Sequence, residues 1–382
     1  MHQDIDVVLV SRGWFPTTKG GAEKFISRLG NELYKRGLKV VGITQWVRNA
    51  FYPKTPYKII FISGKGKPNT LSSLVFSLKA GITVNKLKPC AVIVNGYWGE
   101  LAPLFIKSSK IVTIIHDVGF VNSIYQSKLH YNTIKNIMRK YILSKIIKKS
   151  DIIVVPSLIV KKDIINYISS YCTEKIYVLG FEGIDGPFRR IHVENEYFDI
   201  VHVARFAPNK GHIILLKAFA NILNELKNIR LWLVGGIDAK HIDYYEKIKY
   251  IANNINRKFN KPVVKIVTNA PSLNNYYALA DVCVAPSIGD EGYGLAVAEC
   301  MAYGKPVIAS DIFADTGVVS AERAFVVERG DPYALANTIK YVYLNYEEAL
   351  KKADKGLEFA RKCSWSKVAD KFIELLRHVN CK

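Results

Sequence analysis

The sequence of 382 residues has few cysteines and no long apolar run. Its six cysteines form no CxxC pair and no tight cluster, which argues against a zinc ribbon and a disulfide scaffold and is typical of a reducing cytosol. No apolar stretch reaches the roughly 18 residues that cross a bilayer. The first residues contain Asp4 and Asp6 and predict a strand rather than a signal peptide. We therefore expect a cytoplasmic protein, either free or peripheral on the inner face of the cell membrane.

The chain also lacks the glycine motifs of dehydrogenases and ATPases. The loop after the first expected strand reads SRGWFPTTKGGAE and contains no G-x-G-x-x-G. The segment that holds Gly64 and Gly66 has Asn69 where a third glycine is required, and Pro68 where a Walker motif has Ser or Thr. These absences weigh against a dinucleotide-dependent dehydrogenase and against an ATPase.

Acidic residues are scarce in the first half of the chain. Residues 1–190 carry 29 basic and 11 acidic side chains, whereas residues 191–382 carry 25 basic and 22 acidic ones. Most of the net charge of +21 therefore lies in the first half of the chain. This asymmetry indicates a surface that meets something anionic, such as nucleic acid, an anionic membrane or a phosphorylated acceptor. A lysine-rich surface without such a partner explains the same numbers.

Short runs rich in Val and Ile alternate with helical patterns along the whole chain. Runs of this kind predict parallel strands that are buried on both faces, with the intervening helices covering the sheet. The alternation stops at residues 180–196, which are rich in glycine and charge and predict a linker, and then starts again. The sequence therefore predicts an α/β fold with two doubly wound parallel-sheet domains in tandem.

The most specific segment is APSIGDEGYGLAVAECMAYGKPVIASD, residues 285–311. It begins at the end of an expected strand, passes through a glycine-rich loop and enters a helix. Gly292 and Gly294 let the backbone approach a ligand closely, and the amide groups at the start of the helix suit an anion. Glu291 lies on the loop and Glu299 on the helix, so one carboxylate can reach a sugar while the other reaches a nucleotide ribose.

This segment resembles the E-x(7)-E signature of retaining glycosyltransferases with the GT-B fold, above all glycosyltransferase family 4. Other segments are similar to the family in the same order: GGAEKFISRLGNELYKRGLKV, the His116–Asp117 pair, VHVARFAPNKG, LWLVGG, ADVCVAPS and CSWSKVADKF. The resemblance covers nearly the whole chain. It implies two Rossmann-like domains facing each other across a cleft: 1–186 for the acceptor and 197–360 for the nucleotide sugar. A C-terminal helix in 361–382 would return to the first domain.

The resemblance also implies roles for charged residues. Arg205 and Lys210 would stabilise the departing diphosphate of the donor, so that no metal and no cofactor would be needed. Glu291 would bind hydroxyls of the donor sugar, and Glu299 would bind the ribose. A simpler explanation of Arg205 is that it covers the end of a strand. A simpler explanation of Lys210 is that it is an ordinary surface residue.

Backbone groups complete the expected site. Amides around Gly294 and Leu295 would bind phosphate or sugar, and Gly20 and Gly21 would let the first domain close on the phosphates. His116 would contact the sugar or help to orient the acceptor, although a histidine after a buried strand is often structural. The remaining substrate-binding positions that we expect are Asp117, Gly292 and Tyr293.

Residues 128–149 carry seven basic side chains and no acid. Their apolar residues fall at helical spacing, and a basic amphipathic helix of this kind can lie on an anionic membrane. Alternatively, the apolar face packs on the sheet and the lysines face water. We hypothesise that the first domain rests on the cytoplasmic membrane face and glycosylates a lipid-linked or polyisoprenoid-phosphate acceptor. The apolar residues are Ile134, Ile137, Met138, Tyr141 and Ile142.

The sequence thus predicts a retaining glycosyltransferase that moves a sugar from a nucleoside diphosphate-sugar to a glycan or lipid-linked acceptor. A GT-B-like nucleotide-sugar epimerase or phosphorylase is the alternative among enzymes. A basic nucleic-acid-binding protein is more remote, because the 22 tyrosines and 17 phenylalanines are scattered and no recognition motif appears. No nucleic acid partner is therefore expected. The donor base, the sugar and the oligomeric state are left open.

Overall fold

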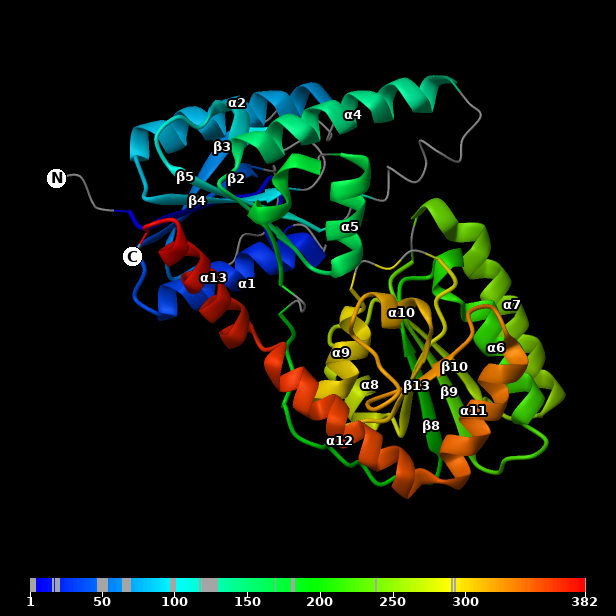
Figure 1. Cartoon of the computed structure of the whole chain (residues 1–382). Coiled ribbons are helices and arrows are strands. Elements are labelled where there is room, and N and C mark those ends of the chain that lie inside the picture. The colour runs from blue at the N-terminus through cyan, green and yellow to red at the C-terminus, as the bar shows by residue number, and fades with distance from the viewer. Residues whose placement is uncertain are drawn as a thin grey trace. The chain divides into compact units, whose positions relative to one another are not determined.

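The chain forms two compact units, each built around one parallel sheet (Figure 1). Unit 1 comprises residues 1–183 and 365–382, and unit 2 comprises residues 184–364. The structure is a computed structural model. It describes residues 5–15, 17, 21–46, 54–63, 70–96, 101–116, 118, 130–168, 170–179, 183–237, 239–289, 291 and 293–381.

The sheet of unit 1 has seven parallel strands in the order β3-β2-β1-β4-β5-β6-β7. Val7 of the central strand lies opposite Val40 on one side and Ala91 on the other. The strand order reverses between β1 and β4, and in such sheets ligands bind beyond the carboxyl ends of the strands at this switch point. The strands are β1 (Val7–Val10), β2 (Val40–Trp46), β3 (Lys58–Ser63), β4 (Ala91–Gly96), β5 (Lys110–Ile115), β6 (Ile152–Val155) and β7 (Ile176–Val178).

Helices cover both faces of this sheet, with α1 and α13 on one face and α2 and α4 on the other (Figure 1). Alternate residues of β1 enter the two cores: Leu9 packs with Phe25 and Phe372, whereas Val8 packs with Phe76. The helices are α1 (Gly21–Lys35), α2 (Thr70–Leu87), α4 (His130–Lys149), α5 (Leu158–Tyr167) and α13 (Trp365–His378), with short 3₁₀ turns η1 (Ala102–Phe105) and η2 (Ser170–Lys175).

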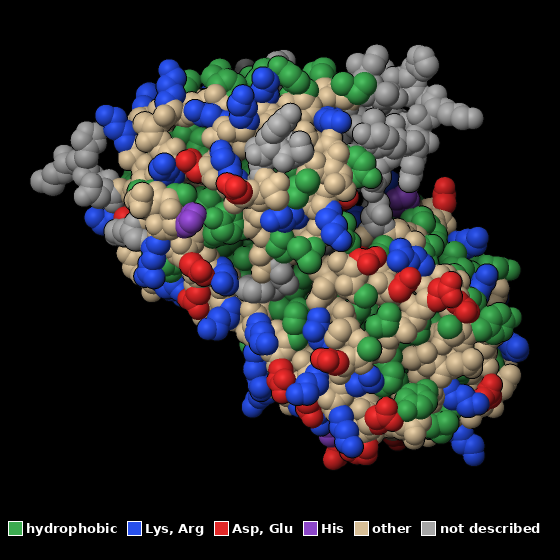
Figure 2. Space-filling view, viewed as in Figure 1, with side chains coloured by type: hydrophobic (Ala, Val, Ile, Leu, Met, Phe, Trp, Pro, Cys, Tyr) green, Lys and Arg blue, Asp and Glu red, His purple; other side chains and the backbone are tan. Residues whose placement is uncertain are grey.

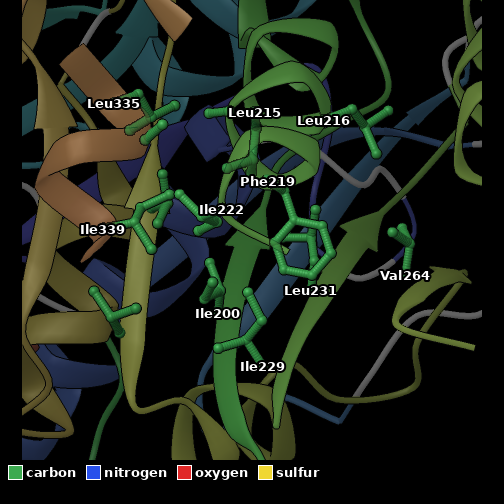
Figure 3. Close-up of a cluster of buried hydrophobic side chains, with 14 of the residues drawn as sticks. Ile200, Leu215, Leu216, Phe219, Ile222, Ile229, Leu231, Val264, Leu335 and Ile339 are labelled. Atoms are coloured by element: carbon green, nitrogen blue, oxygen red, sulfur yellow. The ribbon is translucent and has the colours of Figure 1, made fainter. Parts of the chain in front are cut away.

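The sheet of unit 2 has six parallel strands in the order β10-β9-β8-β11-β12-β13, and its switch point lies between β8 and β11. Ile200 and Leu231 from the sheet pack with Phe219 and Ile339 from the helices on one face (Figure 3). The strands are β8 (Phe198–Val203), β9 (Ile229–Gly235), β10 (Val264–Thr268), β11 (Val282–Ala285), β12 (Val307–Ser310) and β13 (Phe325–Val327).

Helices α6, α7 and α11 cover that face of the unit 2 sheet, and α8 and α9 lie over the other (Figure 1). The α-helices are α6 (His212–Ile222), α7 (Ile242–Lys258), α8 (Asn274–Leu279), α9 (Leu295–Ala302), α10 (Ile312–Asp315), α11 (Pro332–Leu344) and α12 (Tyr346–Lys362), and the 3₁₀ turns are η3 (Pro208–Lys210) and η4 (Ala239–His241).

The predicted α/β fold of two doubly wound parallel sheets is confirmed. The C-terminal helix α13 packs in the core of unit 1, because Trp365 and Phe372 lie on its apolar face and bury against Phe25. The segment predicted as a linker is part of unit 2 from Ile184 onward: that residue is buried, and its amide donates to the carbonyl of Cys363.

The expectation against disulfides is wrong. Cys90 pairs with Cys381 in unit 1, and Cys283 of β11 pairs with Cys300 of α9 in unit 2. The partners are 291 and 17 residues apart in the sequence, and folding brings their Cα atoms to 5.7 and 6.5 Å. Local cysteine spacing could not show such pairs, and the inference of a reducing cytosol loses its support. Cys363 is a buried free thiol.

None of the helices in the described part of the chain combines the length and apolar content that crossing a membrane requires.

Candidate functional site

Two loops meet beyond the carboxyl ends of β8 and β11 in unit 2. The first follows β8 and carries Lys210; the second follows β11 and carries Glu291. The ammonium Nζ of Lys210 donates a hydrogen bond of 2.6 Å to Oε1 of Glu291, and the two side chains are only 17% and 10% exposed. The structure therefore brings together two of the residues that the resemblance selected, as an ion pair at the switch point.

A glycine allows the two loops to approach. Gly211 has a φ of 74° and precedes the first residue of α6. A Cβ atom there would lie 1.8 Å from the carbonyl oxygen of Pro286, so any other residue would push the loops apart. The amide of Ile288 also donates to the carbonyl of Asn209 across the same junction, at 2.9 Å. This contact holds Lys210 within reach of Glu291.

Ser287 belongs to the same cluster, although the sequence analysis did not select it. Its hydroxyl donates to Oε1 of Glu291 at 2.6 Å, and its carbonyl accepts from the hydroxyl of Ser310 at 2.6 Å. One carboxylate oxygen thus accepts from both an ammonium and a hydroxyl. The available signal was position, because Ser287 comes two residues after a buried strand that ends at the switch point.

Arg205 lies on the same loop as Lys210, with an exposed side chain. The next residue, Phe206, is fully buried and stacks on the ring of His212 at 4.9 Å between ring centroids. An aromatic contact therefore fixes the loop against the start of α6, next to the exposed Arg205.

Two buried histidines lie beneath this loop. The Nδ1–H of His202 donates to the carbonyl of Val284 in β11 at 2.8 Å, and its ring meets that of His212 with 4.6 Å between the centroids. Burial lowers the pKa of His202 to about 4 and the pKa of His212 well below its usual value. Both rings are neutral near pH 7 and join β8, β11 and α6 under the ion pair.

The start of α9 presents backbone amides on the neighbouring loop. Gly294 caps this helix with a φ of 106°, and Leu295 is its first residue. The first amides of a helix have no carbonyl partner within it, which makes this end suitable for an anion. Glu299, one turn further along, accepts a hydrogen bond of 2.9 Å from the hydroxyl of Tyr277 in α8. Burial raises the pKa of Tyr277, so the hydroxyl stays protonated.

The side chain of Tyr293 points into the core of unit 2. It is buried inside unit 2, with its hydroxyl 3.4 Å from the sulfur of Cys363, and its carbonyl accepts from the hydroxyl of Thr316 at 2.7 Å. Its side chain therefore anchors the loop between Glu291 and α9.

A second polar cluster lies at the switch point of unit 1. The side-chain amide of Asn95, at the end of β4, donates to Oγ of Ser11 and to the carbonyl of Ala22, both at 3.1 Å. A carbonyl can only accept, so Nδ2 faces α1 and Oδ1 faces His116. The Nε2 of His116 therefore donates to Oδ1 at 2.8 Å. Asn95, which the sequence analysis missed, orients the expected histidine.

The other predicted positions are placed as follows. Gly21 is the first residue of α1 and is exposed. Among the described residues, no three His, Cys, Asp or Glu side chains group as metal ligands, and the expectation that no metal or cofactor is needed stays a prediction. Gly20, Asp117 and Gly292 lie outside the described residues.

Comparison with known proteins relates each unit to one family model. Residues 19–180 match Glycosyltransferase Family 4, and residues 197–345 match Glycosyl transferases group 1. The chain is 28% identical over 178 residues to a phosphatidyl-myo-inositol mannosyltransferase of Mycobacterium leprae. The matched segment covers 45% of this chain and 44% of that protein. The chain thus spans about half the length of the curated relatives it matches.

Solved structures match the fold over nearly the whole chain. Sucrose-phosphate synthase from Thermosynechococcus elongatus has a TM-score of 0.79 at 22% identity and covers 98% of both chains. Anabaena HepE, solved with UDP and glucose, has a TM-score of 0.72 at 16% identity and covers 98% of this chain and 99% of its own. With a family model on each unit and this fold throughout, the chain belongs to the GT-B glycosyltransferases of family 4 and group 1.

Proposed function

We propose that the protein transfers a sugar from a nucleoside diphosphate-sugar to a glycan or lipid-linked acceptor, such as a polyisoprenoid phosphate, at a membrane surface. The transfer retains the anomeric configuration and uses no metal ion or cofactor. The observation that carries the proposal is the cluster of Lys210, Glu291 and Ser287 at the unit 2 switch point.

The cluster suits a departing diphosphate. When the bond between the sugar and the phosphate breaks, negative charge grows on the diphosphate, and a cation already in place lowers the energy of that state. Lys210 is such a cation: Glu291 holds its ammonium before any substrate arrives. Arg205, on the same loop, supplies a second cation whose planar guanidinium suits phosphate oxygens.

The carboxylates suit the rest of the donor. Glu291 accepts two hydrogen bonds through Oε1, and its carboxylate binds hydroxyls of the donor sugar. Glu299 is oriented by Tyr277 and binds the ribose hydroxyls. The amides of Gly294 and Leu295, at the start of α9, bind phosphate or sugar oxygens.

Retention fits a substitution on a single face of the sugar. The acceptor hydroxyl forms its bond to the anomeric carbon on the face from which the diphosphate leaves. Its proton passes to the departing phosphate oxygen, so that no protein nucleophile is required. His116, oriented by Asn95, contacts the sugar or orients the acceptor in unit 1.

The names of two relatives support a lipid-linked acceptor. The mannosyltransferase of M. leprae is named for a phosphatidyl-inositol, and a mouse relative that is 29% identical over 116 residues is named for a dolichol-diphosphate glycan. HepE, which is similar in fold, binds UDP and glucose, in keeping with a nucleotide-sugar donor.

The proposal is tested by hydrolysis of UDP-, GDP- and ADP-sugars by the purified protein. Lys210→Ala and Glu291→Ala should both lose most of the turnover, and Lys217→Ala, an exposed lysine on α6, serves as the matched control. Undiminished turnover in the first two variants would refute the site.

A further inference from the structure

Unit 1 exposes apolar side chains on three neighbouring elements. Both α2 and α4 contact the short turn η1, which lies between them in space. We name the outward face of these three elements the α2–η1–α4 surface. Figure 2 shows green hydrophobic and blue basic side chains along the edge of unit 1 where Figure 1 draws α2 and α4.

Helix α2 is apolar on two opposite sides. Phe76, Ala80 and Val84 are buried against the sheet. A second row faces outward, and its members are between 39% and 47% exposed. A surface helix normally carries polar residues opposite its core face, so this second row indicates that something other than water covers it. The row consists of Leu74, Val75, Leu78 and Ile82.

Helix α4 continues the exposed apolar area. Ile137, Met138 and Tyr141, which form one side of the stripe seen in the sequence, are 54% to 62% exposed. Ile146 and Ile147, near the carboxyl end of the helix, are instead buried, and Ile147 packs against the sheet. The alternative in which the apolar face packs on the sheet therefore does not hold for these three residues. On η1, Leu104 is also exposed.

The charged side chains of α2 and α4 have one sign. Residues 70–96, 101–116 and 130–150 contain no Asp or Glu. Lysines lie among the apolar residues, and the ammonium of Lys145 lies over the ring of Tyr141 at 5.1 Å from its centroid. Lysine stems cover apolar surface while their charged ends reach outward, the arrangement of an interfacial helix on a bilayer. The other exposed lysines are Lys79, Lys107, Lys148 and Lys149.

The geometry points to a docking surface for an anionic lipid bilayer. The exposed apolar side chains enter the boundary between headgroups and acyl chains, and the lysines bind lipid phosphates. A second copy of the chain would set lysines against lysines, which disfavours self-association through this face. The inference deepens the proposed function. It rests on that function in one respect, because a lipid-linked acceptor is the reason for the protein to bind a bilayer.

Flotation of the full chain with vesicles tests this surface. Wild type should float with phosphatidylcholine vesicles that contain phosphatidylglycerol and much less with phosphatidylcholine alone. The double variant Ile82→Glu with Met138→Glu should bind the anionic vesicles at least about tenfold more weakly. It lacks two apolar side chains whose transfer from water into the bilayer favours binding. The matched control is Ile242→Glu with Leu344→Glu, which alters residues of unit 2 that are 53% and 62% exposed.

Three results would overturn the inference. The first is equal binding of wild type to both kinds of vesicle, and the second is an equal loss of vesicle binding in the two double variants. The third is a wild-type dimer that binds no vesicles and that dissociates in the unit 1 double variant. A further pair, Lys79→Glu with Lys145→Glu, should reduce binding to anionic vesicles selectively. Melting temperature and nucleotide-sugar hydrolysis without vesicles should match wild type in every variant. Flotation without hydrolysis would reject the proposed function and leave the docking surface standing.

Discussion

Unit 1 and unit 2 share the strand order around their central strands, but the groups at their switch points differ in charge. In the described part of unit 1, hydrogen bonds join the polar side chains of Ser11, Asn95 and His116. In unit 2, Lys210 and Glu291 form an ion pair at the corresponding place. The same topology thus positions a cluster of hydrogen-bonded polar side chains in one unit and an ion pair in the other, so the loops decide which groups meet at the end of the sheet.

The outer surfaces of the two units also differ in the charges that they carry. Unit 2 mixes charges of both signs, as in the exposed pairs Lys249–Glu246 and Lys355–Glu358. The α2–η1–α4 surface of unit 1 combines exposed apolar side chains with lysines and no acid. Part of the first-half charge excess therefore lies on this surface.

The largest expected effect breaks the ion pair of unit 2. Lys210→Ala should lower kcat/KM for sugar transfer by about 10²–10³-fold, because the departing diphosphate loses a cation that is already in place. Steady-state kinetics with the best donor measure it, beside Lys217→Ala. A loss no greater than that of the control would show that Lys210 does not act on the donor.

Next come the two disulfides, one in each unit. Removing either should lower the free energy of unfolding by about 2–4 kcal/mol. Chain entropy predicts the larger loss for Cys90→Ser with Cys381→Ser, because that bridge closes 291 residues of chain whereas the bridge in unit 2 closes 17. Denaturant unfolding with and without reductant measures both. Unfolding of wild type that reductant does not change would contradict the pairings.

A smaller effect is expected from the polar cluster of unit 1. Asn95→Ala removes the hydrogen bond that orients the ring of His116 and should lower kcat for transfer to the acceptor by about 10–100-fold, since misplacing a group that positions the substrate costs that much. Nucleoside diphosphate binding, which we assign to unit 2, should stay unchanged. Weaker diphosphate binding by this variant would contradict the proposal that unit 2 alone binds the diphosphate of the donor.

The smallest expected effect concerns pH. His202 binds a proton in the unfolded chain near its ordinary pKa of about 6.5 but only near pH 4 in the fold, because burial disfavours its charged form. The unfolded state therefore holds more protons below pH 6.5, and stability falls as the pH drops, by about 1–2 kcal/mol between pH 7 and 5. Denaturant unfolding of His202→Asn should show a shallower decline, and an identical slope would contradict the assignment.

The sequence predicted the parallel strands and the motif loops, because buried Val and Ile runs and glycine-rich turns are local signals. It could not predict partners that only folding brings together. Cys90 and Cys381 are an example, and the bonds from Ser287 to Glu291 and from Asn95 to His116 depend on which loops meet. Nor does the loop position of Tyr293 show that its ring turns inward to Cys363.

Calorimetric binding of UDP, GDP and ADP to wild type, Lys210→Ala and Asn95→Ala tests the division between the units most directly. At least one nucleoside diphosphate should bind wild type and Asn95→Ala with the same affinity, and should bind Lys210→Ala at least about tenfold more weakly, since a phosphate contact to a cation is lost. Equal affinity for wild type and Lys210→Ala, or no binding of any of the three to wild type, would contradict the assignment of the donor to the ion pair of unit 2.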